Sequence, residues 1–233
     1  MGLLTLVFSI AMMACAVLFF VVDSRRTRAH WLASWWGRSV LACHPRCRVR
    51  VTGRQHISPG TPSILIANHQ SLFDIMALFC LRRQFKWVAK DSLFRLPFVG
   101  WAMAVTGYIP LSRGRHGSIR ETYQQAGEWL ASGISVFFFP EGTRSRTGQL
   151  GAFHNGAFKL AVETGTPIVP IAVTGTRDLL VRGSWRLGHH SDIQIVVLPP
   201  LDPARYPQDG AVRLRDDARR LISHTLQQLL ASP

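Results

Sequence analysis

Short apolar runs of strand length alternate with segments of helical character along the chain. The runs are rich in β-branched and aromatic residues and are bounded by glycine, proline or polar clusters, as is typical of buried strands. Strands and helices that alternate in this way predict an α/β fold, in which a central, mostly parallel or mixed sheet is flanked by helices. The expected strands are 46–51, 63–67, 85–89, 107–113, 134–139, 167–174 and 192–198. The expected helices among them are 72–81, 118–132, 155–164 and 211–231.

An apolar segment precedes these elements. Residues from Gly2 to Val22 carry no charge, and about 20 apolar residues are enough to cross the hydrocarbon core of a bilayer. Arg25, Arg26 and Arg28 follow at once, which predicts a membrane anchor with the main domain on the cytoplasmic side. A cleaved signal peptide is the alternative, but no Lys or Arg precedes the apolar run. The protein is therefore expected at a membrane, with the main domain facing the cytoplasm. The membrane that we expect is the bacterial inner membrane.

A second helix is expected over residues 30–41. Trp31, Trp35 and Trp36 form an apolar stripe beside Arg38, as in helices that lie in the interface of a bilayer. A core helix of the globular domain is the alternative, because the stripe is short. Together the two helices predict a membrane-docking pair over residues 1–45, followed by a single α/β domain over residues 46–233.

The chain is strongly basic, with 27 Lys and Arg residues against 13 Asp and Glu residues and a formal net charge of +14. All but three of the cations are arginines, whose planar guanidinium groups suit phosphate. Such an excess indicates nucleic acid, an anionic membrane surface or a phosphorylated substrate. The apolar start disfavours nucleic acid, as does the lack of a zinc-finger spacing, a homeodomain-like helix or an RNA-binding aromatic motif. Membrane lipids, and not nucleic acids, are the expected partners.

The cysteines predict neither a metal site nor a disulfide framework. Cys43, His44 and Cys47 have a loosely metal-like spacing, but no second pair of ligands accompanies them. Cys15 and Cys80 lie in apolar segments, which indicates a domain in a reducing compartment.

One buried strand leads directly into residues that can carry chemistry. The run 63–67 is followed by His69, and Asp74 comes five positions later at the entrance of a helix. A neutral imidazole can accept a proton from an alcohol, while a carboxylate holds its other N–H and stabilises the imidazolium. The spacing allows this contact across a turn but not along one continuous helix. The residues alone leave an alternative open, in which His69 is a turn residue and Asp74 interacts with the helix dipole.

A second polar cluster follows the apolar strand 134–139. It consists of Glu141, Gly142, Thr143 and Arg144. Glycine lets a ligand approach the backbone, and the carboxylate and guanidinium groups could hold a hydroxyl and a phosphate. A solvated turn after a buried strand is the alternative.

Two further cations, Arg113 and Lys90, each end a predicted strand. Loops at the carboxyl ends of strands in an α/β sheet converge on the ligand site, so both are candidates for holding phosphate. Solvated surface charge is the alternative for each.

Four of these segments resemble the ordered sequence blocks of the membrane glycerolipid acyltransferases. Residues 68–74 resemble the His-x4-Asp block, and the closest likeness is to the 1-acylglycerol-3-phosphate acyltransferases. Residues 107–113, 139–145 and 169–173 resemble the second, third and fourth blocks in the same order, and residues 90–103 resemble the segment between the first two. The resemblance covers roughly residues 47–200.

The resemblance implies transfer of a fatty acyl group from acyl-CoA or acyl-carrier protein to the sn-2 hydroxyl of lysophosphatidic acid, which gives phosphatidic acid. It implies no cofactor and no metal, with His69 as the base and Asp74 orienting it. Ser71 is a tempting nucleophile beside His69, but the resemblance implies direct transfer without a covalent acyl-enzyme. Glu141 would position the glycerol, and Arg144 with Arg113 would hold the phosphate.

The second block departs from the family pattern at Ser112, where members often carry an acidic residue. The acceptor head group is therefore open. A different lyso-lipid, such as lyso-ornithine lipid or another lysophospholipid, is one alternative. A non-catalytic protein that binds membrane lipids is the other.

Overall fold

The computed structural model describes residues 23, 25–44, 46–112, 116–145, 147–179, 191–206 and 210–231. The apolar segment expected to anchor the chain, residues 2–22, lies outside this part, and so does Arg113.

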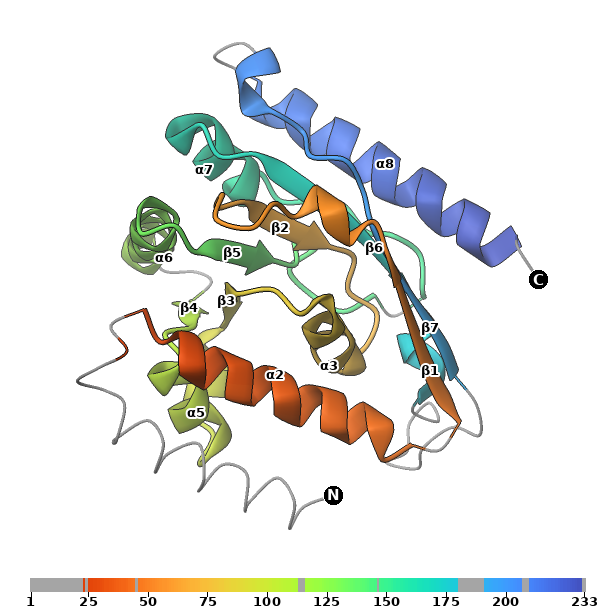
Figure 1. Cartoon of the computed structure of the whole chain (residues 1–233). Coiled ribbons are helices and arrows are strands. Elements are labelled where there is room, and N and C mark those ends of the chain that lie inside the picture. Colours follow the sequence, from red (N-terminus) through yellow and green to blue (C-terminus); the bar gives the residue numbers. More distant parts are fainter. Residues whose placement is uncertain are drawn as a thin grey trace.

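Seven strands form one sheet in the order β1-β7-β6-β2-β5-β3-β4 (Figure 1). Neighbouring strands are parallel, except that β6 and β7 are antiparallel. The prediction of a mostly parallel, mixed sheet is thus confirmed. The strands are β1 (Cys47–Thr52), β2 (Ile64–Ala67), β3 (Phe85–Lys90), β4 (Ile109–Leu111), β5 (Ser135–Phe138), β6 (Ile168–Thr174) and β7 (Ser191–Val197).

Helices cover both faces of the sheet (Figure 1). The helices are α2 (Thr27–Ala42), α3 (Phe73–Leu78), α4 (Asp91–Phe94), α5 (Val99–Val105), α6 (His116–Ala131), α7 (Gly156–Thr164) and α8 (Ala211–Ala231). On β2, Leu65 packs in the core cluster that contains residues of α2 and α3, whereas Ile64 and Ile66 pack with residues of α6, α7 and α8. Because successive side chains of a strand point to opposite faces, a run that is apolar throughout is buried on both.

The expected elements match most of the observed ones. The predicted edge strand, residues 46–51, is β1 at one end of the sheet, and the predicted closing helix, 211–231, has the bounds of α8. Two elements are shorter than expected by three residues or more. The helix expected over 72–81 ends as α3 at Leu78 and continues as the 3-10 turn η2 (Phe79–Leu81). The strand expected over 107–113 is only β4, an edge strand that contains Pro110, a residue that cannot donate a ladder hydrogen bond.

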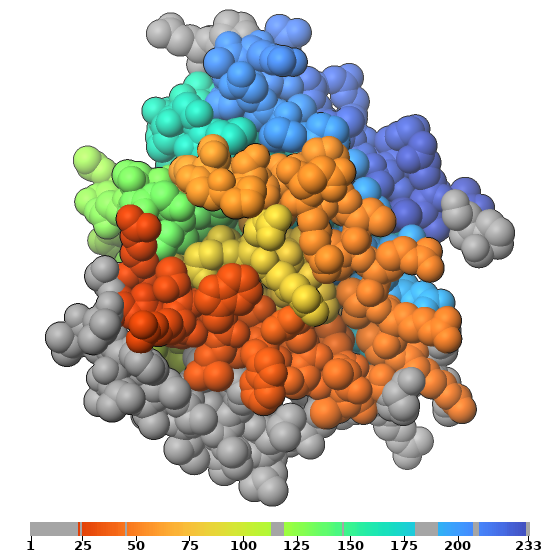
Figure 2. Space-filling model, viewed as in Figure 1, coloured from red at the N-terminus to blue at the C-terminus, as the bar shows by residue number. Residues whose placement is uncertain are grey.

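Helix α2 has a packed face and an exposed one. Gly37 lies against the core, where an added Cβ would be 2.5 Å from Cδ2 of Phe79, and Val40 and Leu41 are buried beside it. Trp31 and Trp35 are exposed on the helix. Figure 2 shows α2, in red to orange, as part of one continuous surface with the orange segment that contains β1. Among the described residues, no helix has the length and hydropathy needed to span a bilayer.

A fully buried lysine fastens the start of α2 to the sheet. Nζ of Lys86, on β3, donates hydrogen bonds to the carbonyl oxygens of Thr106 (2.7 Å), Arg25 (3.0 Å) and Arg26 (3.3 Å). It also lies 4.5 Å from the centre of the Trp129 ring. Burial and, to a lesser extent, the charge of Arg26 lower the pKa of Lys86 to about 7, while Asp23 acts in the opposite direction.

Replacing Lys86 by methionine is expected to change how stability varies with pH. An unfolded lysine titrates at about 10.4, whereas folded Lys86 has a pKa of about 7. Between these values the unfolded chain binds more protons than the folded one, so the free energy of unfolding of the wild type rises with pH. The destabilising contribution of the charged Lys86 is fully present below the folded pKa and is relieved toward about pH 10. The variant lacks this contribution.

Thermal midpoints near pH 6 and pH 10 measure the difference. From pH 6 to pH 10, the thermal midpoint of the wild type should rise relative to that of the variant by roughly 5 °C or more. This follows from about 2–4 °C per kcal/mol for a chain of this size. Lys159→Met, at an exposed lysine on α7, is the control and should follow the wild type. Parallel pH profiles for wild type and Lys86→Met would contradict the assignment.

Candidate active site

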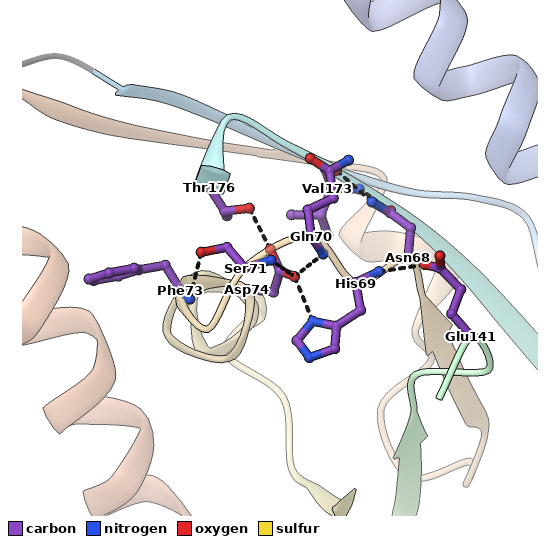
Figure 3. Close-up of polar contacts among 9 residues, drawn as sticks. All are labelled: Asn68, His69, Gln70, Ser71, Phe73, Asp74, Glu141, Val173 and Thr176. Atoms are coloured by element: carbon purple, nitrogen blue, oxygen red, sulfur yellow. Dashed lines mark hydrogen bonds and ion pairs between the residues drawn. The ribbon is translucent and has the colours of Figure 1, made fainter. Parts of the chain in front are cut away.

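His69 and Asp74 meet at the junction of β2 and α3 (Figure 3). Strand β2 ends at Ala67, and Asp74 lies in the first turn of α3. Nδ1 of His69 is 2.7 Å from Oδ2 of Asp74. Since His69 precedes the helix, the five-residue spacing crosses a turn and brings the two side chains together.

The carboxylate of Asp74 is fully buried and bonded on both oxygens. Besides the His69 ring, Oδ2 accepts the backbone N–H groups of Gln70 (2.6 Å) and Ser71 (2.9 Å), and Oδ1 accepts the hydroxyl of Thr176. An ionised carboxylate can only accept hydrogen bonds, so Nδ1 of a neutral His69 carries the proton. Nε2 is then left with the lone pair that can take a proton from a substrate.

The imidazole of His69 is stacked on Phe139. The ring centres are 4.0 Å apart and the planes differ by 15°. Phe139 follows β5 and stacks in turn on Trp87, at 5.5 Å and 13°. With one face against Phe139 and Nδ1 held by Asp74, the ring has a fixed orientation, and 15% of the His69 side chain is exposed.

Asn68 ties the loop before His69 to β6. Its side-chain amide donates to the carbonyl oxygen of Val173 at 2.9 Å and accepts the N–H of the same residue at 2.8 Å. The side chain is buried, so this pair fixes how the ends of two neighbouring strands lie beside each other.

Glu141 makes a bond to the backbone of His69. Its Oε1 accepts the N–H of His69 at 2.8 Å, and its Oε2 accepts the N–H of Gly151 at 2.8 Å. The residue is 8% exposed. Burial raises the pKa of the Glu141 carboxyl, while the two N–H groups act to lower it.

The turn after β5 also holds the carbonyl group of His69. The N–H of Gly142, at a φ of +71°, donates to Phe139 O at 2.9 Å, which closes the turn. The N–H of Ser145 then donates to the carbonyl oxygen of His69 at 2.8 Å. The two clusters predicted separately from the sequence are therefore one unit, because the loop 141–145 binds both backbone groups of His69.

Of the other predicted site residues, those that the structure describes lie at the same edge of the sheet. Thr143 and Arg144 are exposed on the loop after β5. Lys90 is exposed at the end of β3, which is parallel to β5 and to β4. Arg113 would follow β4 but lies outside the described residues. Over the described residues, no group of three or more His, Cys, Asp or Glu side chains could hold a metal ion.

Thr176, Phe139 and Asn68 were not predicted as parts of this site. Asn68 directly precedes His69, and its amide side chain beside the candidate base was the available signal. Phe139 is distant from His69 in the sequence and gives no such signal. Thr176 lies 102 positions from Asp74 and gives no local signal.

Residues 48–174 match the family model described as Acyltransferase. A chloroplastic 1-acyl-sn-glycerol-3-phosphate acyltransferase of Brassica napus is 35% identical over 203 residues, which cover 87% of this chain and 57% of the relative. The chain thus spans little more than half the length of this relative. A 1-acyl-sn-glycerol-3-phosphate acyltransferase of Pseudomonas aeruginosa is 30% identical over 183 residues, or 78% of this chain and 70% of the relative.

The fold is shared with a solved structure, the crystal structure of the 1-acyl-sn-glycerophosphate (LPA) acyltransferase PlsC from Thermotoga maritima. The TM-score is 0.76 at 23% sequence identity, and the match covers 98% of this chain and 97% of that one. The chain belongs to the acyltransferase family that includes the 1-acyl-sn-glycerol-3-phosphate acyltransferases.

Proposed function

We propose that this protein is a 1-acylglycerol-3-phosphate acyltransferase. It moves a fatty acyl group from acyl-CoA or acyl-carrier protein to the sn-2 hydroxyl of lysophosphatidic acid and forms phosphatidic acid, without a further cofactor or a metal. The observation that carries the proposal is the bond of 2.7 Å between His69 and the buried Asp74, in a chain similar to curated proteins of that name.

The chemistry follows from the orientation of His69. Nε2 takes the proton of the sn-2 hydroxyl as its oxygen attacks the thioester carbonyl carbon. A C–O bond forms, the C–S bond breaks, and the departing thiolate takes the proton from the imidazolium. Asp74 stabilises the imidazolium while it exists. Ser71 supports direct transfer, because its hydroxyl oxygen is buried and accepts the N–H of Phe73 at 3.3 Å.

The acceptor is proposed to lie along the edge of the sheet next to His69. Arg144 and Arg113 hold its phosphate, Lys90 adds a further positive charge, and the loop at Gly142 and Thr143 allows close approach of the glycerol. Glu141 positions the glycerol indirectly, through the backbone of His69, since each of its oxygens already accepts an N–H group.

We propose further that residues 1–45 dock the enzyme on a membrane, a bacterial inner membrane, with the acyltransferase domain (46–233) facing the cytoplasm. Trp31 and Trp35 of α2 support this proposal, together with the exposed apolar residues around α5, which are Leu96, Phe98, Val99 and Trp101. The guanidinium of Arg26 donates to the carbonyl oxygen of Ala104 on α5 at 2.7 Å, which brings the two groups to the same side of the molecule. Such amphipathic surfaces suit the bilayer interface, where lyso-lipid and product reside.

A direct assay tests the reaction. The purified full chain, given lysophosphatidic acid and labelled acyl-CoA, should produce labelled phosphatidic acid. His69→Ala serves as the blank, and His154→Ala, at an exposed histidine, as the control that should keep wild-type activity. Absence of labelled phosphatidic acid with acyl-CoA and with acyl-carrier protein would contradict the proposal.

A different lyso-lipid acceptor is the second candidate, because Ser112 stands where members of the family often carry an acidic residue. Ser112 precedes Arg113, and its hydroxyl is hydrogen-bonded to the carboxylate of Asp91, an interaction that lowers the pKa of Asp91. A panel with lyso-ornithine lipid and other lysophospholipids separates the two candidates, because the preferred acceptor shows the highest kcat/KM.

A further inference from the structure

Asp74 is held from two sides by residues that are far apart in the sequence. Oδ2 faces His69 and the turn that follows it. Oδ1 accepts the hydroxyl of Thr176, which lies just after the carboxyl end of β6 (Figure 3). Thr176 is fully buried. Among the residues that the structure describes, Thr176 provides the side-chain hydrogen bond to Oδ1 of Asp74.

The corner that carries Thr176 is fixed by its backbone. Strand β6 ends at Thr174, and Gly175 follows with a φ of +80°. A Cβ on Gly175 would lie 2.1 Å from the carbonyl oxygen of Asp192 on β7, so the close approach of these backbones requires glycine. The carbonyl oxygen of Gly175 also accepts the hydroxyl of Ser191 at 2.6 Å.

The Asn68 amide fixes the same corner relative to the catalytic turn. It binds both backbone groups of Val173, three positions before Thr176, while Asn68 itself directly precedes His69. The distance between the Thr176 hydroxyl and the turn of His69 is therefore set by the pairing of β2 and β6, not by the mobility of a loop.

Without the Thr176 hydroxyl, one buried oxygen of Asp74 would lose the side-chain donor it has in this structure. An unsatisfied buried acceptor is costly, and rotation about the Cβ–Cγ bond would bring it toward the donors around Oδ2. Such a rotation would displace Oδ2 from Nδ1 of His69. The hydroxyl therefore sets the plane in which the carboxylate meets the imidazole.

We propose that Thr176 is a positioning residue for the acyl transfer, which acts by fixing the orientation and the charge of Asp74 toward His69. The inference rests on the proposed function for its kinetic consequences, but not for its effect on His69. A carboxylate rotated away from Nδ1 stabilises the imidazolium less, so a proton on His69 is bound less tightly.

Thr176→Val and Thr176→Ser test the inference as a pair. Valine keeps the shape and removes the hydroxyl, and it should lower kcat by about 10-fold to 100-fold with KM for both substrates nearly unchanged, since one hydrogen bond to a charged group is worth about 1.5–3 kcal/mol. The acid limb of kcat/KM should move to lower pH by about 0.5–1 unit. Serine should restore both properties to near the wild type.

A second measurement reads His69 without turnover. NMR titration of the full chain with ¹⁵N-labelled histidine, assigned with His69→Ala, should give a lower midpoint for His69 in Thr176→Val than in the wild type or in Thr176→Ser. If the protein makes no phosphatidic acid, the proposed function fails while this shift still stands. If the protein is active and the shift is absent, only the role of Thr176 fails.

Thr225→Val is the matched control for a purely structural effect. Thr225 is buried on α8 and donates to the carbonyl oxygen of Leu221 at 2.9 Å. Its replacement should lower the thermal midpoint without moving the titration of His69. If Thr176→Val does not fold, Thr176→Ala carries the same comparison. A folded variant with wild-type kcat and an unmoved His69 midpoint would overturn the inference.

Discussion

Replacing His69 by alanine is expected to lower kcat by about 10³-fold to 10⁴-fold, which is the upper range for loss of a positioned general base. The remaining rate reflects substrate alignment by the rest of the site. Phe139, which stacks on the imidazole, has no group that accepts a proton, and the Asp74 carboxylate faces Nδ1, so neither of these neighbours takes over the role of Nε2. KM for lysophosphatidic acid and acyl-CoA should change little, since the phosphate holders are elsewhere.

Steady-state kinetics on the purified variant measure this effect, with circular dichroism to show that the fold is kept. Asp74→Asn separates the charge from the base. The three donors around Oδ2 favour the amide oxygen at that position, so the imidazole keeps its orientation but loses the negative charge behind it. We expect a loss of about 10²-fold to 10³-fold in kcat. Asp178→Asn, at an exposed residue of the 3-10 turn η3 (Thr176–Leu179), should leave the activity unchanged. A His69→Ala rate within tenfold of the wild type would rule out His69 as the base.

The fold was predictable because its signals are local. The apolar runs that become β2, β5 and β6 are buried along their whole length, as expected for strands covered by helices on both faces. The order of the strands had no such signal. Strand β1 pairs with β7, with Cys47 opposite Ser191, and this choice depends on packing across the whole chain.

Lys86 illustrates what residue type alone cannot indicate. In an otherwise apolar strand, a lysine suggests an exposed position, yet it is fully buried. Its partners are the carbonyl groups of Arg25, Arg26 and Thr106, which no local pattern places near β3. The two faces of α2 show the same limit, because the tryptophan stripe was visible in the sequence but the close packing of Gly37 against Phe79 was not.

The candidate site likewise has a part that could be predicted from the sequence and a part that could not. The contact of His69 with Asp74 followed from a spacing across a turn, whereas the bonds that hold the pair come from distant positions. Glu141 is 72 positions from His69, and Val173 is 105 positions from Asn68. The charged side chain of Glu141 suggested a ligand contact, but its backbone partners could not be read from the sequence.

Replacing Glu141 by alanine is expected to reduce both stability and turnover. The backbone N–H groups of His69 and Gly151 would lose a buried, charged acceptor at 2.8 Å each. Hydrogen bonds to charged groups are worth about 1.5–3 kcal/mol each, so we expect a loss of roughly 3–5 kcal/mol in the free energy of unfolding and a thermal midpoint lower by about 10 °C. The turn before α3 would then no longer hold the imidazole, and kcat should fall by about 10²-fold.

The kinetic pattern distinguishes this indirect role, in which Glu141 holds the backbone of His69, from a direct contact with the glycerol. If Glu141 acts through His69, kcat and the thermal midpoint fall together while KM for lysophosphatidic acid stays near the wild-type value. If it bound the glycerol directly, KM would rise and the midpoint would hold. Glu141→Gln should lie between alanine and the wild type, because an amide offers one acceptor and turns a donor toward the other N–H group. Glu128→Gln, at a surface glutamate that accepts a bond from Gln124, is the control. A raised KM with unchanged stability in both Glu141 variants would return the residue to the ligand contact that its charge suggested.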